Sequence, residues 1–135
     1  MKNFILYVWQ LPQNLVGLLL VLFYRPERQH RLETGNIIYY AYKMKGGISL
    51  GKYSIVNVCH YRDDVAASLA RNTVRHEAIG HAKQSRFLGW LYLPVVGLPS
   101  ILWAACYGTI IRETSNGYYK FYTERWADKL GGVRR

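Results

Sequence analysis

Residues 75–85, Arg75-His76-Glu77-Ala78-Ile79-Gly80-His81-Ala82-Lys83-Gln84-Ser85, hold two of the four histidines and one of the eight acidic residues of this 135-residue chain. A histidine followed by a glutamate, and by a second histidine about one helical turn later, is the arrangement that a zinc hydrolase site requires. The imidazoles bind the ion, and the glutamate takes a proton from the water that the ion activates. We therefore expect the fold to be organised around a helix that carries this stretch.

The two histidines are one residue further apart than in the common His-Glu-x-x-His motif. On a regular α-helix, His76 and His81 would point about 140° apart and could not share an ion. A π-turn, with i→i+5 hydrogen bonds, would bring them onto one face. Alternatively, Glu77 and His81 are the ligands on a regular helix, because residues at i and i+4 share a face, and His76 lies beside them. An ordinary polar helix face with a chance His/Glu cluster is a third reading.

A second motif, Glu124-Arg125-Trp126-Ala127-Asp128, lies more than forty residues downstream. Together, His-Glu…Gly-His-x-x-Gln and Glu-x-x-Ala-Asp resemble the gluzincin metallopeptidases, notably the CAAX prenyl proteases and the related heat-shock proteases. The resemblance covers residues 73–88 and 119–132. It implies a Zn²⁺ ion bound by His76, His81 and Glu124, a catalytic base in Glu77, and supporting roles for Asp128, which orients a histidine, and for Gln84.

The composition favours a membrane surface as a partner. Half of the residues are hydrophobic, with 12 Tyr and 4 Trp, and the formal net charge is +10. Tyr and Trp collect at membrane–water interfaces, and the positive charge suits anionic lipid head groups or nucleic acid. Because no nucleic-acid-binding motif accompanies the charge, we expect lipid rather than nucleic acid. The resemblance to metallopeptidases implies a peptide or protein as substrate. Cys59 and Cys106 make no disulfide framework, and their apolar neighbours predict buried free thiols.

Residues 1–24 are predicted to form an apolar anchor or an in-plane helix, with a buried core helix as the alternative. Asn14 can cap the second part of this segment and Pro26 can end it. Three arginines follow within residues 25–31, which favours a cytoplasmic position for that face. We therefore expect a membrane-associated protein whose active-site face is cytoplasmic.

The middle of the chain alternates between β-like and helical patterns. Residues 36–58 are rich in β-branched and aromatic residues around Gly46-Gly47 and predict an antiparallel β-hairpin. Residues 64–86 predict the helical region of the metal motif, in which Asn72 or Thr73 begins a second helix. Residues 118–130 predict the helix of the third ligand, ended by Gly131-Gly132.

Residues 87–111 contain no charged residue and are long enough to cross a bilayer once. A single crossing would separate Glu124 from His81, and the segment contains Pro94 and Pro99, which favour a break. We therefore predict a re-entrant hairpin of two apolar arms; a single span and a buried helical hairpin are the alternatives.

These patterns predict a mainly α fold with a small antiparallel β-hairpin, an α+β class in one compact domain with apolar membrane-associated helices. The predicted function is that of a membrane-associated zinc metallopeptidase-like hydrolase that uses metal-activated water. The alternative is a non-catalytic membrane-associated interaction protein with a structural metal or none.

Overall fold

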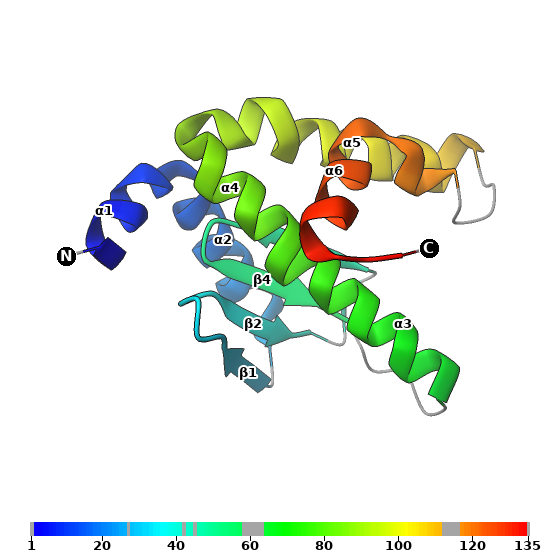
Figure 1. The fold of residues 1–135 in the computed structure, drawn as a ribbon, viewed down its shortest axis with the longest axis horizontal. Helices are drawn as coiled ribbons and strands as arrows, with labels where there is room; N and C mark the ends of the chain where they lie inside the picture. Colours follow the sequence, from blue (N-terminus) through cyan, green and yellow to red (C-terminus); the bar gives the residue numbers. More distant parts are fainter. Residues whose placement is uncertain are drawn as a thin grey trace.

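The fold is mainly helical with a small mixed sheet, which confirms the α+β class. The computed structural model describes residues 2–26, 28–41, 43–44, 46–57, 64–111 and 117–134, so Cys59 lies outside the described residues. The sheet is enclosed between α2 (Leu11–Tyr24) and a long helical run that crosses it diagonally (Figure 1). This arrangement follows from the alternation of side chains along the strands, since Ile38 and Val56 pack towards the helical run and Ile55 packs towards α2.

The N-terminal apolar segment forms α1 (Lys2–Trp9) and α2. Asn14 is not the helix cap that we predicted: α2 begins at Leu11, with a proline in its first turn. Asn14 is instead fully buried, donates a hydrogen bond to the carbonyl of Tyr7 and accepts one from the backbone N–H of Lys52. Both polar ends of this buried amide therefore have a hydrogen-bond partner, which avoids the cost of an unsatisfied buried group.

The sheet has the strand order β1-β2-β4-β3 and contains more than the predicted hairpin. The antiparallel hairpin is formed by β3 (Gly47–Leu50) and β4 (Tyr53–Val56), and its turn lies at Gly51, which has a positive φ, rather than at Gly46-Gly47. β2 (Ile37–Tyr40) pairs with β4 in parallel, and the exposed β1 (Arg28–Arg31) pairs antiparallel with β2. The charged sequence of β1 concealed this strand, because edge strands tolerate charge on both faces.

The helical run across the sheet consists of α3 (Asp64–Val74), the π-helix η1 (Arg75–His81) and α4 (Ala82–Leu88). The predicted start of a second helix at Asn72 or Thr73 is wrong, because α3 continues to Val74 and the junctions keep helical dihedral angles. Of the alternatives that the sequence left open for residues 76–81, the structure has the π-turn.

The predicted re-entrant hairpin of residues 87–111 is also wrong. The chain turns at Gly89, which has φ +55°, and then continues as η2 (Gly89–Leu91), η3 (Leu93–Gly97), α5 (Leu98–Cys106) and η4 (Tyr107–Ile111). In Figure 1 these segments follow one another along the top of the molecule. Pro94 and Pro99 each lie in the first turn of a helical segment, where the missing N–H costs little, so they cause no break.

Within the described residues, no helix is both long enough and apolar enough to cross a membrane. Cys106 is exposed on α5, contrary to the buried position that we expected. After η5 (Tyr118–Lys120), α6 (Tyr122–Gly131) returns to pack on η1, and Gly132 ends it in the left-handed conformation.

Close contact between α6 and η1 depends on two glycines. A Cβ at Gly80 would collide with the backbone carbonyl of Ala127, and one at Gly131 would lie 2.6 Å from the carbonyl oxygen of Arg75. Because both obstacles are backbone atoms, neither can move aside easily. The two helices that carry the sequence motifs, η1 and α6, therefore pack this closely because Gly80 and Gly131 have no side chain.

Candidate metal site

His76 and His81 face the same point because η1 is a π-helix. Its i→i+5 hydrogen bonds place residues five apart on one side of the helix. The two imidazole rings lie edge to face, with their centroids 4.8 Å apart, and both residues are buried. On a regular α-helix, residues five apart would point in different directions, but in this π-helix both imidazoles lie on one face.

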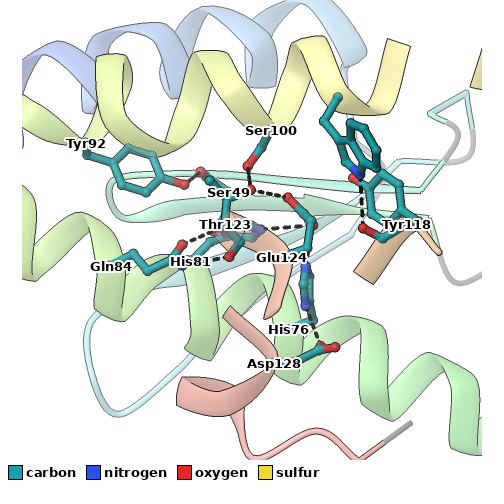
Figure 2. A network of polar contacts seen from close by, with 11 residues as sticks. Ser49, His76, His81, Gln84, Tyr92, Ser100, Tyr118, Thr123, Glu124 and Asp128 are labelled. Carbon is teal, nitrogen blue, oxygen red and sulfur yellow. Dashed lines mark hydrogen bonds and ion pairs between the residues drawn. The ribbon is translucent and has the colours of Figure 1, made fainter. Parts of the chain in front are cut away.

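Glu124 on α6 reaches the same point from the opposite side (Figure 2). Its Oε2 atom lies 3.0 Å from Nε2 of His76 and 3.7 Å from Nε2 of His81. Ligand atoms about 2.0–2.1 Å from a tetrahedral zinc ion lie roughly 3.3 Å from each other. The distances from Oε2 of Glu124 to the two imidazole nitrogens lie on either side of this value and are compatible with a shared ion.

Glu77 completes a group that could hold a metal ion. One ligand atom from each of His76, Glu77 and His81 lies within 4.8 Å of the others, and all three residues are buried. Gly47 at the start of β3 leaves room for this glutamate, since a Cβ at Gly47 would lie 2.6 Å from Cγ and 2.8 Å from Oε1 of Glu77.

Both histidines are oriented through their other ring nitrogen. Nδ1 of His76 donates to Oδ1 of Asp128 at 2.7 Å, and Nδ1 of His81 donates to Oε1 of Gln84 at 2.7 Å. These bonds fix the tautomer that leaves Nε2 available, as second partners of metal-binding histidines do. Gln84 is held in turn by a 2.9 Å bond from its Nε2 to the carbonyl of Thr123.

The charges of the site are compensated within it. Burial lowers the pKa of His76, but its hydrogen bonds to Asp128 and Glu124 outweigh this and raise the pKa to about 9. Burial raises the pKa of Glu124, but the hydrogen bond from His76 and the nearby imidazole of His81 outweigh this and hold that pKa far below its usual range. Asp128 and Glu124 thus stabilise a positive charge between them. When no metal is bound, the protonated imidazole of His76 carries that charge.

Sequence reasoning missed the residues that surround the carboxylate of Glu124. Thr123 donates from Oγ1 to Oε1 of Glu124 at 3.1 Å, and Ser100 on α5 donates to that Oγ1 at 2.8 Å (Figure 2). Burial, followed by the charge of Glu124, raises the pKa of Tyr118, so this phenol keeps its proton. No sequence motif includes Ser100 or Tyr118. Thr123 alone could have been found from the sequence, because it directly precedes Glu124.

A cavity of about 200 Å³ opens at these groups and is bounded by β3, α5, Glu77, His81 and Tyr118. A neighbouring apolar cavity of about 420 Å³ is lined by residues of α2, η3 and α5. Both are also lined by Ile48 and Leu50 of β3. The site is therefore accessible beside an edge strand and next to apolar space.

Comparison with known proteins adds no relative: no family model, curated protein or solved structure matches this chain.

Proposed function

We propose that the protein is a zinc metallopeptidase-like hydrolase, with His76, His81 and Glu124 as metal ligands and Glu77 as the catalytic base. The observation that carries this proposal is the buried convergence of two imidazole nitrogens and one carboxylate oxygen, which lies 3.0 Å from one nitrogen and 3.7 Å from the other. Two nitrogen ligands and one carboxylate, with a further position open, are typical of catalytic zinc. The similarity of the two motifs to gluzincins supports the same reading.

A zinc ion bound there would polarise a carbonyl group and lower the pKa of water. In this proposal, Glu77 accepts the proton of the attacking water and passes it to the leaving amine. Tyr118, which remains protonated beside the cavity, donates a hydrogen bond to the carbonyl oxygen as negative charge develops on it. Asp128 and Gln84 keep the two imidazoles in place.

The substrate class that fits is an extended peptide. β3 lies at the edge of the sheet beside η1, and an edge strand can bind a peptide through backbone hydrogen bonds. In gluzincins, a strand beside the zinc helix holds the substrate in this way. The adjoining apolar cavity suits a bulky apolar side chain of that peptide.

The decisive experiment combines metal analysis with peptide cleavage. The purified wild type should contain about one zinc per chain and should cleave members of a proteome-derived peptide library, as detected by mass spectrometry. Glu77→Gln should keep the zinc and lose cleavage, since an amide cannot accept the proton. Loss of zinc in Glu77→Gln would instead make Glu77 a ligand. Zinc binding without cleavage by the wild type would favour the alternative of a structural metal in an interaction protein.

We further propose that the protein works on an anionic membrane surface, with its site on the cytoplasmic side. Large apolar side chains of α1, of the end of α4 and of η2 are exposed, among them Phe4 (71%), Phe87 (76%) and Leu91 (61%). The net charge of +10 complements anionic lipids. Co-sedimentation with vesicles of phosphatidylglycerol should recover the protein, and Phe87→Ser/Leu91→Ser should reduce the bound fraction.

A further inference from the structure

A third cavity, of about 190 Å³, shares no lining residue with the cavity at the metal site. Its wall carries three cationic side chains from separate elements: Arg31 of β1, Lys52 of the β3–β4 turn and Arg86 of α4. None of its lining residues is acidic. Within the described part of the chain, no carboxylate forms an ion pair with any of the three.

Two of these cations are held in place by neutral groups. The guanidinium of Arg86 donates to the carbonyl oxygen of Thr34 at 2.6 Å and to Oδ1 of Asn36. The ammonium of Lys52 lies 4.6 Å from the ring centroid of Tyr7. These partners orient the charges without neutralising them.

Uncompensated positive charges around one hollow raise the electrostatic potential inside it, and an anion that enters relieves their mutual repulsion. Guanidinium groups match the oxygens of a phosphate in a forked geometry, while an ammonium adds a compact point charge. The volume is below the roughly 300–1,000 Å³ of sites for drug-sized ligands, so it suits a small group.

We propose that this cavity binds a phosphate group through Arg31, Lys52 and Arg86. The group can belong to a soluble phosphate or to the head group of an anionic lipid. The second source is relevant because Leu6, which lines the cavity, is 36% exposed on α1, the helix that also exposes Phe4. The proposal does not depend on the metal site or on hydrolase activity.

The test follows the backbone amide signals of Thr34, Gly35 and Asn36 by NMR while inorganic phosphate is added to the full chain. We expect saturable shifts in the wild type and binding about thirty-fold weaker in Arg31→Gln/Lys52→Gln, since each cation removed near an anionic group weakens binding about five-fold. In a parallel arm, vesicles of phosphatidylcholine with and without phosphatidic acid replace the soluble phosphate. Saturation by inorganic phosphate identifies a soluble ligand, whereas cavity-dependent binding to phosphatidic acid alone identifies a head group.

Two control variants keep the result interpretable. Arg125→Gln/Lys129→Gln removes the same number of charges from the exposed surface of α6 and should bind like the wild type in the phosphate titration. Arg31→Lys/Lys52→Arg preserves both charges and should bind within a few-fold of the wild type, even if the neutral variant folds poorly. The proposal would be overturned if the cavity variant and the α6 variant lost the same amount of binding. It would also be overturned if neither inorganic phosphate nor phosphatidic acid showed binding that depends on the cavity residues.

Discussion

His76 and His81 are five residues apart in the sequence, yet their imidazole rings lie edge to face with centroids 4.8 Å apart. The π-helix η1 causes this proximity, because its wider turn brings an i+5 pair onto one face. The extra residue relative to His-Glu-x-x-His is thus absorbed by the local backbone.

Removal of Glu124 should release the metal. Glu124→Ala and His81→Ala each delete a group at ligand distance and should lose at least 90% of the zinc measured by elemental analysis. Asp128→Asn keeps the ligands but weakens the orientation of His76, so it should bind zinc about 10- to 100-fold more weakly. Lys129→Gln, on the exposed side of the same helix, is the matched control. Full zinc occupancy in Glu124→Ala would exclude Glu124 as a ligand.

Deletion of Ile79 should retain the metal. The deletion restores the spacing of the common motif, so η1 can become a regular α-helix with both histidines still on one face. The measurement is zinc content together with a structure of the variant. Had Glu77 and His81 been an i,i+4 ligand pair, the same deletion would separate them and abolish binding; loss of zinc from a folded variant would therefore argue for that pair.

Gly47→Ala should impair hydrolysis without removing zinc. The added Cβ would lie 2.6–2.9 Å from side-chain atoms of Glu77, which can swing aside at small cost to folding. The displaced carboxylate would then be a poor base, and we expect kcat to fall at least ten-fold with the zinc content unchanged. Gly108→Ala, at a glycine without a positive φ whose Cβ would meet nothing within 4 Å, is a control for the effect of substituting a glycine. Unchanged kcat in Gly47→Ala would argue against Glu77 as the base.

The metal-free protein should lose stability as the pH rises above neutrality. The pKa of His76 is raised from 6.5 to about 9 in the folded state, so its contribution to stability is complete below pH 6.5 and disappears as the pH passes through 9. Glu124, whose pKa is lowered, contributes above pH 4.5 and loses that contribution as the pH falls. Urea unfolding of chelator-treated protein should give a smaller free energy of unfolding at pH 9.5 than at pH 6.

His76→Gln should show much less of this alkaline decrease, because it lacks the titrating group. A free energy of unfolding that rises between pH 6 and pH 9.5 in the chelator-treated wild type would contradict the raised pKa of His76.

Only part of the site was within reach of sequence reasoning. The motifs located His76, Glu77, His81 and Glu124, because metal ligands are few in type and regular in spacing. Tyr118 and Ser100 carry no such signal, since hydroxyl-bearing residues are common and their proximity to Glu124 depends on how α5 and α6 pack.

The sequence by itself determined the α+β class, whereas for residues 76–81 it left a widened turn and a regular helix as alternatives. An i+5 pair on a helix can share an ion only if the turn is widened, and the structure has this widened turn as η1. The end of α6 at Gly131-Gly132 was also predictable from local sequence, because the residue after the last helical turn adopts a left-handed conformation that favours glycine.

Tertiary structure alone decided the pairings between distant segments. The parallel pairing of β2 with β4 joins residues sixteen apart, and periodicity within either strand is the same for parallel and antiparallel partners. Pro94 and Pro99 read as breaks, but the turn occurs at Gly89, where a Cβ would collide with the indole ring of Trp9 on α1. Such contacts arise between side chains and backbones far apart in the chain, so no local pattern specifies them.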